Sequence, residues 1–69
     1  MISYKPFYNL LKEKEISTYK LINTYGLSSS LLNRLRHNKP INTTTINDLC
    51  KILDCSIENI LEYIPDEEA

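Results

Sequence analysis

The chain has 69 residues and a formal net charge of −1, with 42% hydrophobic and 25% charged residues. A chain this short supports one core, so we expect residues 1–69 to form a single domain, ordered over about residues 4–64 and frayed in the acidic tail 65–69. The composition excludes a disordered linker, a membrane span of about 18 apolar residues and a secretory signal, and it indicates a cytoplasmic globular protein.

The first predicted helix covers residues 6–14. Pro6 suits the first turn of a helix, and an apolar stripe follows it at helical spacing. The stripe consists of Phe7, Leu10 and Leu11. Ahead of this helix, Ile2 and Tyr4 alternate with polar residues, which is a weak signal for a short extended segment.

A second and a third helix follow, joined by a tight turn. Ser17 and Ser28 are good N-cap residues. Gly26, the only glycine in the chain, is expected to end the second helix in the left-handed conformation that favours glycine. Asn38 closes the third helix because asparagine tolerates the same conformation, and Pro40 prevents continuation. The expected inward residues are Leu21, Ile22, Tyr25, Leu31, Leu32 and Leu35, with Leu27 inside the turn.

Two further helices are predicted in the remainder of the chain. Asn42 or Thr43 caps a fourth helix, and Ser56 caps a fifth, shorter helix that Pro65 ends. The inward residues of the fourth helix are Ile46, Leu49, Cys50 and Leu53. Those of the fifth helix are Ile57, Ile60, Leu61 and Ile64. The predicted fold class is therefore all-α, a compact five-helix domain with a helix-turn-helix at the second and third helices.

Residues 18–38 have the sequence form of a helix-turn-helix. The leucines hold the two helices at a fixed angle, so that the polar side of the third helix projects outward and can enter a major groove about 12 Å wide. Arg34 can fork onto guanine, and Asn33 can pair with adenine. The predicted base-reading residues are Ser29, Ser30, Asn33 and Arg34. Contacts to phosphate, which set register without reading sequence, are predicted for Thr18, Lys20, Ser28, Arg36, His37, Lys39, Asn42 and Thr43.

Charge is divided unequally along the chain. Residues 1–47 carry seven basic and two acidic side chains, a net charge of +5, whereas residues 48–69 carry one basic and seven acidic side chains, a net charge of −6. One face can therefore be basic although the whole molecule is not, which fits a phosphate footprint. A surface of merely solvated charges is the alternative.

One pattern of residues spans nearly the whole chain. It consists of Leu21, Gly26-Leu27-Ser28, Leu32-Asn33-Arg34-Leu35, Ile46, Leu49, Leu53 and Cys55-Ser56. This pattern resembles the Xre family, the Cro and lambda-repressor type, and the resemblance implies a five-helix DNA-binding domain that acts as a transcriptional regulator on a double-stranded operator, in many members as a repressor. The chain departs from the family at Ile22, where a small residue is usual, at Thr18, where many members have Gln, and at Arg36, where Glu is common.

Other functions compete with this interpretation. The alternative is a protein-interaction module that uses a helix-turn-helix scaffold without sequence-specific DNA binding, with the acidic residues 48–69 as its working surface. Cys50, Cys55 and a distant His37 are too few ligands for a metal site. No catalytic motif is present, so we expect no enzyme activity, no cofactor and no small-molecule substrate.

Oligomeric state bears on how such a domain reads DNA. One domain reads about half of a typical operator, so a homodimer is the simplest expectation. The fifth predicted helix is the candidate interface because it is rich in apolar residues. The alternative is that these residues pack inward against the first and fourth helices.

Overall fold

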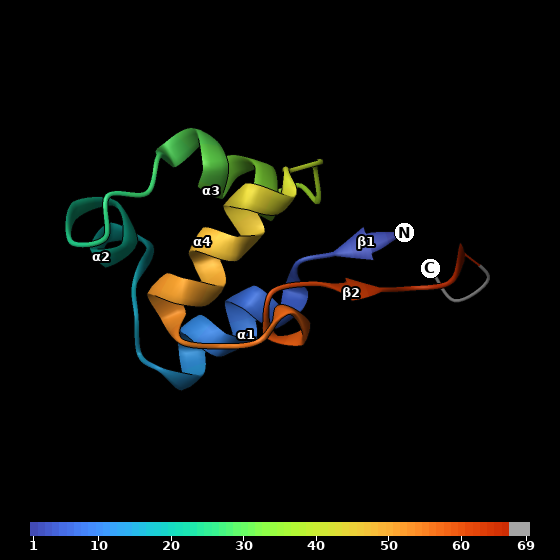
Figure 1. Ribbon diagram of the computed structural model, residues 1–69, viewed down its shortest axis with the longest axis horizontal. Coiled ribbons are helices and arrows are strands. Elements are labelled where there is room, and N and C mark those ends of the chain that lie inside the picture. Colours follow the sequence, from blue (N-terminus) through green and yellow to red (C-terminus); the bar gives the residue numbers. More distant parts are fainter. Residues whose placement is uncertain (67–69) are drawn as a thin grey trace.

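The computed structural model describes residues 1–66, so the part of the expected acidic tail at 67–69 lies outside the described residues. The elements in chain order are β1 (Ile2–Ser3), α1 (Lys5–Glu13), α2 (Thr18–Asn23), α3 (Ser29–Arg36), α4 (Thr43–Leu53), a 3-10 turn η1 (Ile57–Asn59) and β2 (Glu62–Tyr63). The helices enclose the core, and β1 and β2 form a ribbon that extends from it (Figure 1). The predicted helical fold class is confirmed, although its fifth helix is not.

Helix starts follow local capping chemistry. Ser17, Ser28 and Asn42 each accept a hydrogen bond from the backbone N–H three residues later, at 3.1, 3.1 and 2.8 Å. These bonds satisfy N–H groups that have no acceptor within the helix. The structure thereby selects Asn42 over Thr43 as the cap of α4. Helix α1 begins one residue earlier than predicted, with Pro6 in its first turn.

Helix ends depend on residues with positive φ. Glu15, Asn38 and Asp54 follow α1, α3 and α4 with φ of 55, 53 and 51°. The predicted left-handed conformation of Asn38 is therefore confirmed. Helix α2 is shorter than predicted because it ends at Asn23, so that Gly26, with φ of 75°, lies inside the turn that follows the helix.

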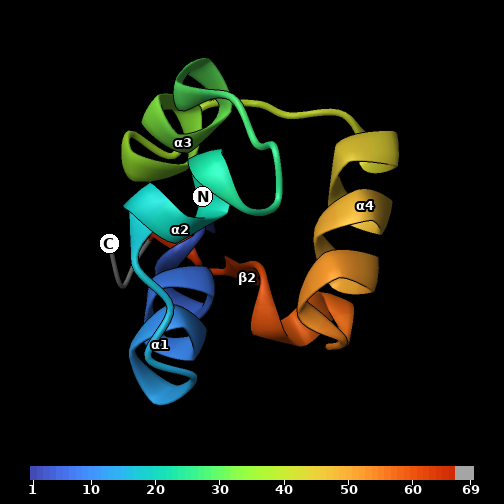
Figure 2. The same ribbon diagram turned by 90° about the vertical axis from the view of Figure 1, so that its left-hand side faces the viewer.

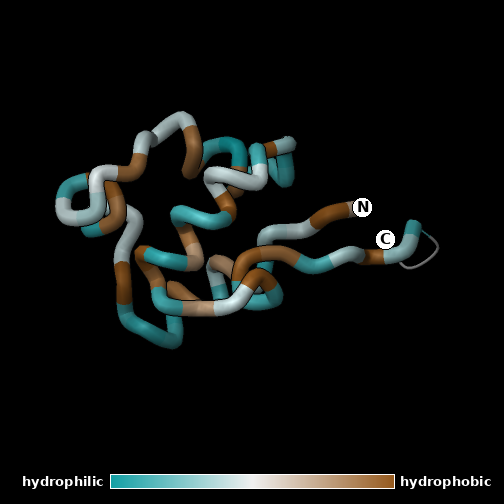
Figure 3. The backbone as a smooth tube through the Cα atoms, in the orientation of Figure 1, coloured by the Kyte–Doolittle hydropathy of each residue, from teal (hydrophilic) through white to brown (hydrophobic). Residues whose placement is uncertain are grey.

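The core is formed by the inward faces of the helices and by one residue near each end of the chain. Its buried hydrophobic members are Tyr4, Phe7, Leu10, Leu11, Leu21, Leu32, Leu35, Leu49, Leu53 and Ile60. Apolar stretches alternate with polar ones along the helical segments, as Figure 3 shows. Ile22 and Tyr25 were expected to face inward but are 38% and 37% exposed. A six-residue α2 buries only Leu21, and Tyr25 lies beyond its end.

The predicted fifth helix is wrong. After the short turn η1, residues 62–63 pair antiparallel with residues 2–3, with Ile2 opposite Tyr63 and Ser3 opposite Glu62. The weak signal for an extended N-terminal segment is thus confirmed by β1. Ile60, which lies between η1 and β2 in the sequence, is fully buried, whereas Ile57, three residues earlier, is 50% exposed. The apolar residues of this segment therefore face in different directions and form no helical stripe.

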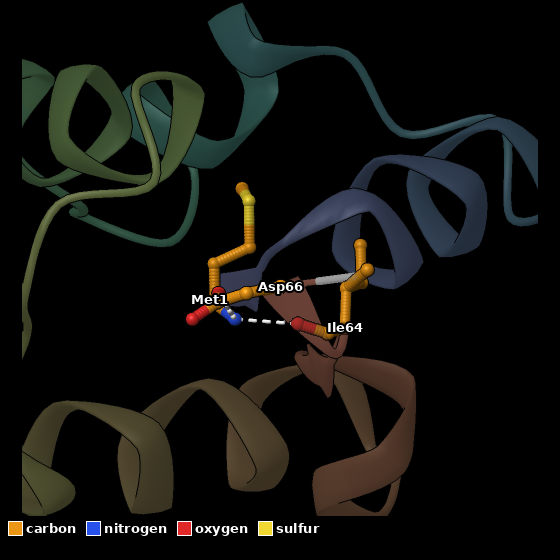
Figure 4. A network of polar contacts seen from close by, with 3 residues as sticks. All are labelled: Met1, Ile64 and Asp66. Carbon is orange, nitrogen blue, oxygen red and sulfur yellow. Dashed lines mark hydrogen bonds and ion pairs between the residues drawn. The ribbon is translucent and has the colours of Figure 1, made fainter. Parts of the chain in front are cut away.

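Hydrogen bonds between the two ends of the chain extend the pairing of β1 with β2. The Ile64 N–H donates to the Met1 carbonyl at 2.7 Å, and the N-terminal amine donates to the Ile64 carbonyl. The same amine lies 3.3 Å from Asp66 Oδ1 (Figure 4). Within residues 1–66, no helix combines the length and the apolar character that crossing a membrane requires.

Candidate nucleic-acid interface

The turn between α2 and α3 fixes how the two helices are presented. Gly26 has a φ of 75°, and nothing lies within 4 Å of the position that a Cβ would take, so the backbone conformation and not space favours glycine here. The next residue, Leu27, donates its N–H to the Leu21 carbonyl at 3.1 Å and packs its side chain against the core. Figure 2 shows α2 directly below α3, with α4 to the right of both helices.

Helix α3 has one buried face and one exposed face. Leu32 and Leu35 are 4% and 1% exposed and anchor the helix on the core. The four predicted base-reading residues are all exposed; they are Ser29, Ser30, Asn33 and Arg34. We call these four residues the recognition face. Helix α3 has eight residues and is therefore about 12 Å long, and the diameter of an α-helix with its side chains, about 10–12 Å, fits a major groove about 12 Å wide.

Two surface hollows flank the recognition face. The first, of about 210 Å³, lies between α2 and α3 and is lined by Thr18, Ile22, Ser29, Leu32, Asn33 and Arg36. The second, of about 270 Å³, lies between α3 and the start of α4 and is lined by Ser28, Ser30, Leu31, Arg34, Ile41, Asn42 and Thr45. Ser29 and Asn33 therefore border the α2 side, whereas Ser30 and Arg34 border the α4 side.

Four of the predicted phosphate-contact residues line these hollows. Thr18 and Arg36 come together beside α2, and Ser28 and Asn42 come together beside α4. Lys20 is not part of either group, because it lies about 200° around α2 from Thr18. Its phosphate contact stays a prediction that the arrangement of α2 does not favour.

Helix capping limits what Ser28 and Asn42 can offer a ligand. Their side-chain oxygens already accept backbone hydrogen bonds at the starts of α3 and α4, so the donors that remain are the Ser28 hydroxyl and the Asn42 amide N–H groups. Thr45, which donates its hydroxyl to Asn42 Oδ1 at 2.9 Å, lies in the same hollow. Sequence reasoning missed Thr45, although its position three residues after an N-cap was a signal for this contact.

The other predicted phosphate contacts lie in the loop that joins α3 to α4 and at the first residue of α4. His37 and Lys39 in the loop and Thr43 in α4 are all exposed. The His37 ring lies with Nδ1 2.9 Å from the Asn33 carbonyl. Because a carbonyl only accepts, Nδ1 carries the proton in this contact, and Nε2 is the ring atom that can meet a further partner.

The segment that carries α2, α3 and the start of α4 has a positive net charge. Residues 16–47 contain no acidic side chain and include Lys20, Arg34, Arg36 and Lys39. No ion pair involves these four cations in the described part of the chain. The first N–H groups of α3 lack helical acceptors and add partial positive charge at its start. The surface is therefore suited to a polyanion.

The groups with shifted pKa values lie outside this surface. Burial raises the pKa of the Cys55 thiol, and the neighbouring Cys50 raises it further. A hydrogen bond with Ser56 lowers the pKa of the exposed Glu58 carboxyl. Neither Cys55 nor Glu58 therefore belongs to the candidate interface.

Comparisons with known proteins match this arrangement. The profile of the Cro/C1-type HTH DNA-binding domain matches residues 8–66, which include α2, α3 and α4. Among solved structures, the chain is similar to that titled "Crystal structure of transcriptional regulator VanUg, Form II", with a TM-score of 0.83 and 26% sequence identity, over 94% of this chain and 87% of that chain. No curated protein sequence matches the chain. The match confirms the resemblance noted from the sequence, and the chain belongs to the Cro/C1-type helix-turn-helix DNA-binding domain family.

Proposed function

We propose that the protein is a sequence-specific transcriptional regulator that reads double-stranded DNA with α3 and acts as a repressor by occupying an operator. The observation that carries the proposal is the exposed recognition face, which is backed by buried leucines and belongs to a segment, residues 16–47, that contains no acidic side chain. The family match and the likeness to a transcriptional regulator support it.

In this proposal, some residues of α2 and α3 contact phosphate and others read bases. Arg34 forks onto the O6 and N7 atoms of guanine, and Asn33 pairs with the N6 and N7 atoms of adenine, each contributing about 1–3 kcal/mol of discrimination. Ser29 and Ser30 add contacts at the start of the helix, by hydroxyl or backbone N–H. Arg36 and Thr18, on the α2 side, contact phosphate and set the position of α3 in the groove.

Selection of bound duplexes from a random DNA library tests the proposal. We expect the wild-type protein to enrich one shared motif and Arg34→Ala to lose preference at one guanine of that motif. The matched control is Arg36→Ala, two residues away on the same helix, which should weaken binding to all sequences alike and leave the motif unchanged. An unchanged motif with Arg34→Ala would contradict the assignment of Arg34.

We also propose that the protein binds its operator as a homodimer through the segment 57–64. This segment is not the helix that was expected, but Ile57 and Tyr63 are 50% and 68% exposed, and Ile2, opposite Tyr63 in the ribbon, is 42% exposed. A two-fold dimer places two recognition helices about 34 Å apart along the duplex.

Sedimentation equilibrium tests the proposed dimer. We expect Tyr63→Glu to shift the protein towards monomer, because a charge would be buried in the apolar interface. Tyr19→Glu is the matched control, since Tyr19 is 75% exposed on α2. A wild-type protein that stays monomeric with and without a two-half-site duplex would overturn the homodimer and leave DNA reading by α3 untouched.

A further inference from the structure

The N-terminal segment contacts the loop that joins α3 to α4. Tyr4, which is 4% exposed, donates its backbone N–H to Asn38 Oδ1 at 3.1 Å and its hydroxyl to the Lys39 carbonyl at 2.9 Å. The two partners lie 34 and 35 positions away in the chain. Tyr4 lies between β1 and α1, so these bonds join the N-terminal segment to the loop that directly follows α3.

Two hydrogen bonds fix the backbone of Lys39, one through its N–H and one through its carbonyl. Its N–H donates to the Arg34 carbonyl at 2.9 Å, which completes the end of α3. Its carbonyl accepts the Tyr4 hydroxyl. Asn38, held in the left-handed conformation with φ of 53°, turns the chain between the end of α3 and Lys39. The side chain of Lys39 is nevertheless exposed, so a flexible cation projects from a fixed backbone.

We propose that Tyr4 is a positioning residue for DNA binding, which holds the backbone of Lys39 so that its ammonium group reaches a backbone phosphate beside the recognition face. This inference rests on the proposed function. A long side chain loses less conformational freedom on binding when its backbone is already fixed, because only the side-chain torsions remain to be ordered. Tyr4 itself, being buried, does not touch DNA.

The variant Tyr4→Phe isolates the hydroxyl, because phenylalanine keeps the ring in the core. We expect duplex binding to weaken by roughly fivefold at fixed salt, as for loss of one neutral hydrogen bond. The slope of log affinity against log salt should become shallower by up to about 0.9, as for loss of one phosphate contact. The sequence preference should not change, since Lys39 reads no base.

Tyr8→Phe is the matched control. Tyr8 donates its hydroxyl to the Leu32 carbonyl at 3.3 Å, inside α3 and away from the loop. This variant also removes one hydroxyl from the back of α3, so a loss through general destabilisation would appear in both variants. We expect Tyr8→Phe to keep the wild-type salt slope. If Tyr4→Phe does not fold, Asn38→Gly removes the other bond of Tyr4 while keeping a residue that accepts positive φ.

A double-mutant cycle with Lys39→Ala decides the inference. If Tyr4 acts through Lys39, Tyr4→Phe should cost little affinity once Lys39 is alanine. Additive losses, or a wild-type salt slope in folded Tyr4→Phe, would overturn the positioning role while leaving the proposed function intact. Absence of duplex binding by the wild-type protein even at low salt would instead overturn the proposed function.

Discussion

Gly26 and Asn38 are single residues on which the placement of α3 depends. Each has positive φ, 75° before the helix and 53° after it. The two residues differ in their surroundings. Nothing lies near the position of a Cβ at Gly26, whereas the Asn38 side chain accepts a hydrogen bond from the Tyr4 N–H. The first is a conformational requirement, and the second combines conformation with a tertiary contact.

Replacement of Gly26 should therefore act through backbone strain alone. We expect Gly26→Ala to lower the free energy of unfolding by about 1–2 kcal/mol, because a residue with a Cβ is disfavoured at this φ. Gly26→Asn should cost less, since asparagine tolerates the left-handed region. Urea denaturation of the three proteins measures the difference, and equal stability of the alanine and asparagine variants would refute this explanation.

The thiol of Cys55 offers a pH-dependent prediction. Burial and the neighbouring Cys50 raise its pKa, so the folded protein favours the neutral thiol. The stability that this contributes is present below the pKa of the unfolded chain and is lost as pH rises through the higher folded pKa. Because the thiolate is the nucleophile, Cys55 should react with iodoacetamide more slowly at pH 8 in the native protein than in urea.

Removal of the partner thiol provides the control for Cys55. In Cys50→Ala, the contribution of Cys50 is absent, and the alkylation of Cys55 should become faster. A rate that does not respond to this change would show that Cys50 has no influence on the neighbouring thiol.

At the level of elements, the sequence predicted what is local and missed what is not. Caps such as Ser17 and Ser28 lie within three residues of the N–H groups that they bind, so the starts of the helices could be predicted from the sequence. Pairing of Ile2 with Tyr63 joins opposite ends of the chain, and helical periodicity carries no information on it. For the same reason, the apolar residues of 57–64 were predicted as a helix.

The same difference between local and long-range contacts decides what could be predicted of the candidate site. The exposed recognition face could be predicted because Leu32 and Leu35 mark the buried side of α3, and the opposite side follows from helical geometry. The burial of Tyr4 and its bonds to the loop could not be predicted, because they depend on the path of the N-terminal segment across the core.

The cap of α3 gives the test at this scale. Ser28→Ala removes the acceptor of the Leu31 N–H, and we expect a loss of about 1 kcal/mol in the free energy of unfolding. The matched control is Ser30→Ala, an exposed serine within the same helix, which should change stability little. Thermal unfolding followed by circular dichroism measures both. An equal effect of the two changes would indicate that Ser28 does not cap α3.

On the scale of the whole molecule, charge separates two regions. The surface built by residues 16–47 has no acidic side chain, whereas most acidic residues follow Asn47. A polyanionic duplex is attracted by the first region and repelled by the second, so the charge distribution orients the molecule as it approaches DNA. A protein partner that docks on the exposed apolar side chains of residues 57–64 would use the other region, and its binding would depend much less on salt than duplex binding does.

Mapping of backbone amide NMR shifts during titration with a selected duplex tests the central claim most directly. If α3 enters the major groove, the largest changes should fall on residues 28–37 and on the loop to Asn42, should weaken steeply with added salt and should need a higher duplex concentration in Arg34→Ala. Changes confined to residues 57–66, or none at low salt, would contradict the account.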